Sequence, residues 1–100
     1  MTEINDISDM PALRTEIDAL DAELVRLLAR RHALIDRAAQ IKKVGKLPAR
    51  IDWRVEEVVA NAARHAVENG LDPELIGSIW RQLVEAAIAQ EDCHLKGDSE

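Results

Sequence analysis

The chain has 100 residues, which is enough for one domain with a small hydrophobic core. Hydrophobic residues make up 47% of the chain, but Trp53 and Trp80 are its only aromatic residues, and glycine and proline are scarce. This composition favours helices over a β-sheet or a disordered chain. The formal net charge of −6 argues against a general binder of nucleic acids or anionic membranes, because such proteins need a basic surface.

The cysteine content and the lack of sorting signals predict a cytoplasmic protein. Cys93 is the only cysteine, so no disulfide can form within the chain, as expected in a reducing compartment. Residues 1–8 lack the basic stretch followed by an apolar run that marks a signal peptide. No segment approaches the ~18 consecutive apolar residues of a membrane-spanning helix, so we expect no membrane partner.

The first predicted helix is long for a chain of this size. It runs from about residue 10 to residue 43, with Ser8 or Asp9 as its N-cap, and Gly45 and Pro48 end it. At 1.5 Å per residue its length is roughly 50 Å, whereas a compact domain of about 100 residues has a diameter of roughly 35 Å. The helix therefore extends beyond its own domain.

An apolar stripe follows this helix along its length. Two shorter helices cannot cover all of it, so a second copy of the chain must cover the rest. An intertwined homodimer with twofold symmetry is the simplest solution. The stripe consists of Leu13, Ile17, Leu20, Leu24, Leu27, Leu28, Leu34, Ile35 and Ala38.

Two further helices complete a predicted all-α fold with three helices in each chain. The second helix runs from about residue 51 to residue 68 and stops at Asn69-Gly70, a common C-terminal signal. The third begins at Pro73, with Asp72 as its N-cap, and extends to about residue 94. We therefore assign residues 1–9 to an N-terminal extension, 10–95 to the helical domain and 96–100 to a polar tail.

Two cationic side chains lie on the apolar stripe of the first helix. At 100° per residue Arg31 falls in the middle of the stripe, and Lys42 falls near its centre three turns further on. A buried cation needs an anion from the protein or from a ligand, unless its side chain extends along the apolar surface to water. Arg14 lies off the stripe, about 25 Å from Arg31 along the axis. It is either a surface residue or part of the partner chain's pocket in an antiparallel dimer.

The other two helices add one carboxylate and one cation near their apolar faces. In the third helix Glu91 continues the apolar stripe, either as a pocket residue or as a solvated carboxylate near a frayed end, and Gln90 lies beside it. Arg54 borders the apolar side of the second helix, at a solvated edge or at a pocket rim. The two apolar sides contain Ile51, Val55, Val58, Val59, Ala62 and Ala66 in the second helix and Trp80, Val84 and Ala87 in the third.

The sequence offers little for other kinds of chemistry. The three histidines are dispersed, and Cys93 next to His94 is a poor spacing for metal ligands, so we expect no metal site. There is no glycine-rich phosphate loop and no nucleophile motif, and we expect no cofactor. The residues expected on an outer, solvated face of the first helix are Asp18, Asp21 and Asp36.

A set of motifs extends from residue 10 to residue 93, nearly the whole chain. Arg54 lies near the start of the second helix, and Gly70-Leu71-Asp72-Pro73 opens the third. The first helix contains Leu13-Arg14-x-x-Ile17-Asp18-x-Leu20-Asp21, followed by Leu27-Leu28-Ala29-x-Arg31 and then Lys42. Together these motifs resemble those of the all-helical chorismate mutases.

The resemblance implies an intertwined homodimer with two equivalent sites for a small dicarboxylate substrate. Arg14 from the partner chain would hold one carboxylate of the substrate, Arg31 would bind the region of the other, and Lys42 would bind the ether oxygen. Arg54 matches a basic position of the family. Glu91 falls where the family usually carries a Gln that also donates to the ether oxygen.

Three of the implied substrate-binding positions depart from the family pattern. Val55 stands where many of these mutases have a Glu that binds the substrate hydroxyl, Ala87 replaces a common Ser, and Ile51 replaces a common Asp. The Arg54-Val55 pair and the run at residues 68–72 also resemble the sibling isochorismate-pyruvate lyases. Those enzymes share the fold and the cation pocket.

The cations suit the rearrangement of chorismate to prephenate. Chorismate is a dianion that must be held in a folded chair, and positive charge or donors at its ether oxygen help as the C–O bond breaks. No metal or cofactor is needed for this reaction. An ionised Glu91 would repel the developing negative charge, so Glu91 must be protonated to donate, and activity is expected to decline as the pH rises.

Three alternatives stay open. The same cations suit an isochorismate-pyruvate lyase, and the altered polar contacts suit a 4-amino analogue of chorismate. A non-catalytic helical dimerisation module would instead pair its cations with internal carboxylates, and replacing Arg31 by Ala would then damage folding. In an enzyme the same variant folds and loses turnover. The enzyme interpretation depends on Arg31 and Lys42 pointing into a shared hollow whose charge only a dianionic ligand completes.

Overall fold

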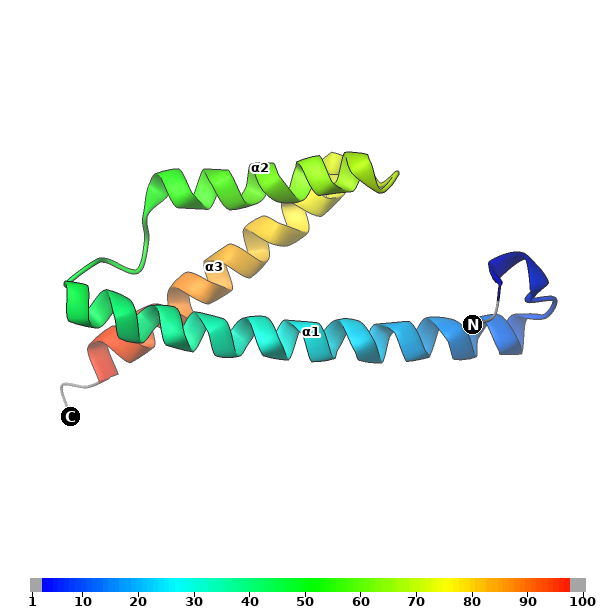
Figure 1. Ribbon diagram of the computed structural model, residues 1–100, viewed down its shortest axis with the longest axis horizontal. Helices are drawn as coiled ribbons and strands as arrows, with labels where there is room; N and C mark the ends of the chain where they lie inside the picture. The colour runs from blue at the N-terminus through cyan, green and yellow to red at the C-terminus, as the bar shows by residue number, and fades with distance from the viewer. Residues whose placement is uncertain (1–2, 98–100) are drawn as a thin grey trace. The chain divides into compact units, whose positions relative to one another are not determined.

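The computed structural model describes residues 3–97. These residues form helices joined by short loops, and there is no strand among them. A short 3-10 helix, η1 (Ile4–Asp6), precedes three α-helices: α1 (Met10–Gly45), α2 (Asp52–Glu68) and α3 (Pro73–Gly97) (Figure 1). The predicted all-α class, with three helices of which the first is the longest, is confirmed. The chain divides into two compact units, Met1–Ala33 and Leu34–Glu100, and the boundary lies within α1.

Both predicted N-caps can be checked against backbone hydrogen bonds. The backbone N–H of Ala12 donates to Asp9 Oδ1 at 2.8 Å, so Asp9, of the two candidates, caps α1. The N–H of Glu74 donates to Asp72 Oδ1 at 2.9 Å. Asp72 therefore caps α3, and Pro73 occupies the first helical position, where the missing N–H of proline has no consequence.

The C-terminal ends of α1 and α2 have the same geometry but use different residues. After α2, Gly70 has a φ of 73°, and Leu71 N–H donates to Ala66 O at 2.8 Å. After α1 the equivalent position is Lys46, with a φ of 58°, and Leu47 N–H donates to Lys42 O at 2.8 Å. A left-handed conformation costs a non-glycine residue about 1–2 kcal/mol. This turn ends α1 one helical turn beyond Lys42.

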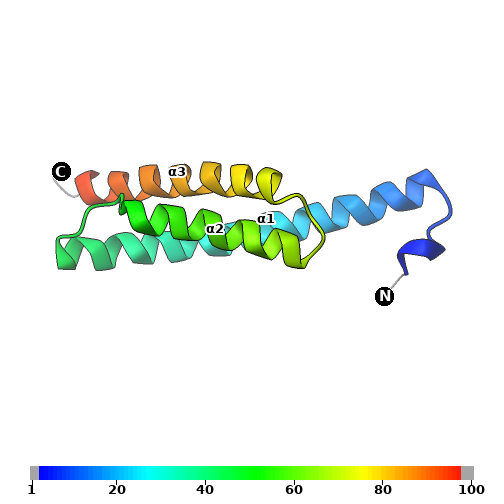
Figure 2. The same ribbon diagram turned by 90° about the horizontal axis from the view of Figure 1, so that it is seen from above.

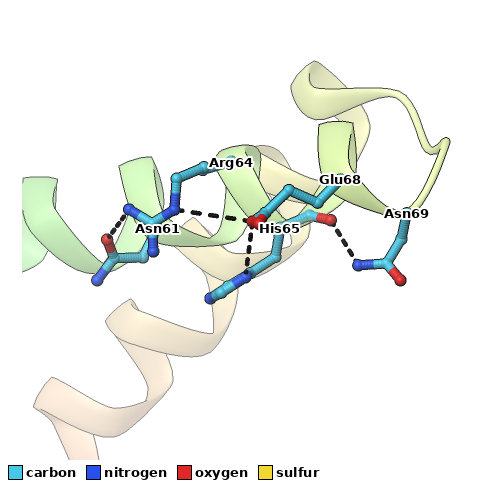
Figure 3. Close-up of polar contacts among 5 residues, drawn as sticks. All are labelled: Asn61, Arg64, His65, Glu68 and Asn69. Carbon is cyan, nitrogen blue, oxygen red and sulfur yellow. Dashed lines mark hydrogen bonds and ion pairs between the residues drawn. The ribbon is translucent and has the colours of Figure 1, made fainter.

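Polar side chains at the end of α2 bond mainly within their own helix (Figure 3). Arg64 and His65 each approach the carboxylate of Glu68, at 3.8 and 3.4 Å, and Arg64 donates to Asn61. Asn69 Nδ2 donates to the carbonyl oxygen of His65 at 2.8 Å. These contacts are one helical turn apart and exposed, so they stabilise the helix end only slightly. His65 therefore has the surface role expected from the sequence.

The hydrophobic core described here belongs to the C-terminal unit. Helices α2 and α3 run in opposite directions, joined by a short loop, and lie side by side (Figures 1 and 2). Their buried residues come from the predicted apolar sides of both helices, and Ala39 from α1 is completely buried. Most of these side chains are small, so the helices can approach closely. The buried residues are Ala39, Ala49, Val55, Ala62, Ala66, Val84, Ala87, Ile88 and Glu91.

The N-terminal unit leaves its large apolar side chains exposed in the single chain. Between 42% and 61% of the surface of each stripe residue is accessible to solvent in the segment from Ile17 to Leu28. Burying apolar surface is worth about 25 cal/mol per Å², so an uncovered stripe of this length favours association. The residues are Ile17, Leu20, Leu24, Leu27 and Leu28.

Two exposed ion pairs join α3 to α2 and to the loop before it. Arg81 donates both terminal nitrogens to Glu56, at 3.0 and 3.2 Å, and Arg50 donates to Glu85 at 2.5 Å. The hydrogen bonds from Arg81, with its positive charge, lower the pKa of Glu56 below its usual 4.5. The hydrogen bond from Arg50 lowers the pKa of Glu85 in the same direction.

These shifts predict a specific sensitivity to acid. A carboxyl group whose pKa is lower in the folded state stabilises the fold above its unfolded pKa, and this contribution is lost as the pH falls through the folded pKa. We therefore expect Glu56→Gln to make the stability of the protein less dependent on pH below about pH 4.5. Arg81→Gln, which removes the partner, should have the same effect. Urea denaturation between pH 2.5 and 7 measures it, and an unchanged pH dependence in both variants would contradict the assignment.

Candidate functional site

A lysine and a glutamate from different helices meet in the C-terminal unit. Lys42 lies in the last turn of α1, and Glu91 lies near the C-terminal end of α3. Lys42 Nζ is 2.6 Å from Glu91 Oε1, and the two side chains are only 18% and 7% exposed. Lys42 Nζ also donates a hydrogen bond to the carbonyl oxygen of Ala49 at 2.7 Å. The ammonium is thus held between a carboxylate and the loop that follows α1.

The charge of Glu91 is balanced, but its hydrogen-bonding capacity is not used. Its buried Oε1 accepts no hydrogen bond from the residues that the structure describes, because Lys42 Nζ approaches at ion-pair distance outside hydrogen-bond geometry. An unsatisfied buried acceptor costs about 1–3 kcal/mol. A hydrogen-bond donor from a ligand would remove this cost.

This pair corrects one expectation from the sequence. The sequence left the anion for Lys42 open between the protein and a ligand, and the enzyme interpretation required the ligand. Instead the protein supplies the carboxylate of Glu91, as the dimerisation module requires. The physical reason is the periodicity of α3, which places Glu91 on the same buried face as Val84 and Ala87. That face packs against the end of α1, which also contributes the completely buried Ala39. Glu91 is therefore not the solvated end residue of the alternative interpretation.

An apolar cluster adjoins the Lys42–Glu91 pair through Ala49. Val55 is buried in this cluster, Ala87 is buried on α3, and Ile51 is half-buried. In such surroundings charges are weakly screened, so a charge change at Glu91 acts strongly on Lys42. The members of the cluster are Ala49, Val55, Val84 and Ile88.

Arg54 lies outside this apolar cluster. Its side chain is exposed and donates to Glu57, one turn further along α2. Of the two alternatives for Arg54, the single chain favours a residue at the solvated edge.

Asp36 is a polar residue whose place the sequence did not predict. It was expected on the solvated face of the first helix, and this is wrong: Asp36 is half-buried against α3. Its Oδ1 accepts a hydrogen bond from Gln90 Nε2 at 2.7 Å and lies 2.7 Å from His94 Nε2. Gln90 therefore contacts Asp36, while Glu91 contacts Lys42. The spacing Asp36-x-x-Ala39-x-x-Lys42 could have indicated this position of Asp36, because it puts a small residue between two polar ones on one helix face.

Arg14 and Arg31 belong to the N-terminal unit. Arg14 is exposed and Arg31 is half-buried. Their participation in a site with Lys42 is a proposal, taken up below.

The described residues offer no obvious metal site and no membrane span. No group of three or more His, Cys, Asp or Glu side chains within residues 3–97 is arranged to hold a metal ion. No helix in this part of the chain is long and apolar enough to cross a membrane.

Comparisons with known proteins extend along nearly the whole chain. A 4-amino-4-deoxychorismate mutase from Streptomyces venezuelae is 32% identical over 99% of this chain and 93% of its own length. A second protein of that name, from Streptomyces pristinaespiralis, is 30% identical over 83% of this chain, which spans 64% of that relative. The isochorismate pyruvate lyase of Pseudomonas aeruginosa is 30% identical over 86% of this chain and 84% of its own length.

The sequence model of one family matches a segment that contains α2 and most of α1 and α3. This family is described as chorismate mutase type II, and the match covers residues 13–92. The match includes Lys42, Glu91 and the apolar cluster beside them. The chain therefore belongs to the type II chorismate mutase family.

Proposed function

We propose that this protein is a chorismate mutase, an isomerase that rearranges chorismate to prephenate without a metal or cofactor. The observation that carries the proposal is the family match over residues 13–92, which includes Lys42, a cation bonded to Ala49 O beside an apolar cluster. The pairing of Lys42 with Glu91 is the one expected of the dimerisation module, so the substrate would have to compete with Glu91 for Lys42. In a family of chorismate mutases, such a fixed donor suits the ether oxygen of the substrate.

The chemistry requires positioning and charge rather than a nucleophile. In the [3,3] rearrangement the ether C–O bond breaks while a C–C bond forms, and negative charge develops on the ether oxygen. Lys42 would stabilise this charge through a hydrogen bond. Arg31, and Arg14 from the partner chain, would bind the two carboxylates and hold the folded conformer. The other substrate-binding positions proposed are Ile51, Arg54, Val55 and Ala87.

Glu91 controls how much positive charge Lys42 presents to the substrate. With Glu91 ionised, the pair is neutral overall, and the carboxylate would repel both the dianion and the developing charge. A neutral donor at this position would leave Lys42 its full charge and supply a second hydrogen bond.

A homodimer is part of the proposal. It accounts for the exposed stripe from Ile17 to Leu28, which a second chain would cover. It also brings in Arg14, which lies about 25 Å from Arg31 along the same helix and cannot share a pocket with it within one chain.

A second candidate function is that of an isochorismate-pyruvate lyase. A third candidate is a mutase that acts on the 4-amino analogue of chorismate. Val55 and Ala87 are both buried and apolar, so neither can hydrogen-bond a ring hydroxyl. Two of the relatives described above are named for 4-amino-4-deoxychorismate and one for isochorismate. These names support testing all three compounds.

The deciding experiment incubates the purified protein separately with chorismate, isochorismate and 4-amino-4-deoxychorismate. Formation of prephenate from chorismate, with no salicylate or pyruvate from isochorismate, is the expected result. Salicylate and pyruvate from isochorismate alone would establish the lyase instead. Turnover of the 4-amino compound alone would establish that mutase activity.

Replacing Arg31 distinguishes the interpretation of the protein as an enzyme from its interpretation as a non-catalytic dimerisation module. We expect Arg31→Ala to fold normally and lose turnover, because the cation serves the substrate and not the core. The matched control is Arg30→Ala, which changes the neighbouring, exposed arginine and should leave turnover unchanged. Circular dichroism and kinetics are compared for both variants. An unfolded Arg31→Ala together with an inactive wild type would favour the dimerisation module.

A further inference from the structure

Asp36 makes a second polar connection between α1 and α3, close to the Lys42–Glu91 pair. Gln90 Nε2 donates to Asp36 Oδ1 at 2.7 Å, and His94 Nε2 lies 2.7 Å from the same oxygen. Because a carboxylate only accepts hydrogen bonds, His94 must carry its proton on Nε2 to make this contact. Hydrogen bonds to a charged acceptor are about twice as strong as neutral ones.

The two polar connections lie on either side of a small apolar residue of α1. On α1, Asp36 and Lys42 are about 9 Å apart along the axis, and the completely buried Ala39 lies midway between them. On α3, Glu91 lies between Gln90 and His94 in sequence. The same short segment of α3 therefore bonds to α1 at two points.

Small apolar side chains do not fix the rotation of one helix against another. Ala39 on α1 and Ala87 on α3 are both buried, and their methyl groups have no shape that selects one orientation. Neighbouring residues on a helix differ by 100° in direction, so Gln90 and Glu91 compete for the face that meets Lys42. The bonds from Gln90 and His94 to Asp36 select the rotation in which Glu91 meets Lys42.

We propose that Asp36 is a positioning residue, which holds Gln90 and His94 so that the carboxyl group of Glu91 stays at Lys42 Nζ. This proposal rests on the proposed function only for its effect on catalysis. The positioning itself is a property of the protein without substrate. Asp36 does not touch the substrate in this scheme.

The kinetic test compares two substitutions of Asp36 with a control. In Asp36→Asn the remaining side-chain oxygen still accepts hydrogen bonds, so kcat should be close to that of the wild type. In Asp36→Leu both bonds are lost, and we expect kcat to fall about tenfold, since small misplacements of catalytic groups are costly. KM should change little, because Asp36 does not bind the substrate. Asp18→Asn, an exposed aspartate of α1, should leave both constants unchanged.

A second readout does not depend on activity. With carboxyl-labelled glutamate, the NMR signal of Glu91 is assigned from its absence in Glu91→Gln. We expect Asp36→Leu to shift this signal, because Glu91 moves away from Lys42. Asp36→Asn and Asp18→Asn should leave it in place.

The outcomes separate the positioning role from the proposed reaction. An unchanged Glu91 signal in a folded Asp36→Leu variant overturns the proposal, whatever the enzyme activity. An equal loss of kcat in Asp36→Asn and Asp36→Leu overturns it as well. A wild-type protein that is inactive on all three substrates overturns the proposed function, and the NMR result then still decides the role of Asp36. If Asp36→Leu does not fold, Gln90→Met provides the same NMR comparison, with a shifted Glu91 signal expected.

Discussion

Lys42→Met is expected to lower kcat for chorismate by about a hundredfold or more, which is the usual loss when one preorganised donor to a developing oxyanion is removed. The reason is that Lys42 is a partly buried ammonium fixed at two points, by Ala49 O at 2.7 Å and by Glu91 Oε1 at 2.6 Å. Methionine fills a similar volume without the charge. The measurement is kcat and KM at constant pH, with the loss expected mainly in kcat.

Lys43→Met is the matched control for this substitution. Lys43 is the next residue of α1 and is exposed, so its replacement removes the same charge from the chain without removing the buried donor. We expect its kcat to remain near that of the wild type. A comparable loss in both variants would mean that overall charge, and not the position of Lys42, determines turnover.

The same substitution has an expected effect on stability. Removing one partner of a buried ion pair costs about 3 kcal/mol or more, because the other charge is left without compensation. Adding Glu91→Leu to Lys42→Met should recover much of the stability but none of the activity. Urea denaturation of the single and double variants at constant pH tests the first statement, and kcat tests the second.

Glu91→Gln is expected to raise the turnover of the enzyme. The carboxylate of Glu91 offsets the charge of Lys42 and cannot donate a hydrogen bond, whereas an amide is uncharged and can donate. The variant should therefore turn over about tenfold faster than the wild type at constant pH, a difference of about 1.4 kcal/mol in the barrier.

The matched control for this variant is Asp92→Asn. It removes a carboxylate from the adjacent position of α3 and should leave kcat near that of the wild type. A Glu91→Gln variant that loses activity would contradict the role given to Glu91, since the carboxylate would then have a role that the amide cannot fill.

Much of the fold could be predicted from the order of the residues. The caps at Asp9 and Asp72 and the end of α2 at Asn69-Gly70 are local events, determined by residues within one turn of each other. The buried sides of α2 and α3 follow from a periodicity of 3.6 residues, which also placed Glu91 on a buried stripe. The turn at Lys46 was harder to predict, because lysine rarely adopts a positive φ.

The sequence by itself determined three helices, their ends, their apolar sides and the presence of cations and one carboxylate on those sides. Only the tertiary structure decided that Lys42 meets Glu91, that Gln90 and His94 meet Asp36, and that Asp36 is not a solvated residue. The physical reason is that periodicity gives the direction of each side chain around its own helix but not which face of a neighbouring helix lies opposite. At the contact of α1 with α3 the buried residue of α1 is an alanine, so the large side chains that mark a packed face in a sequence are missing there.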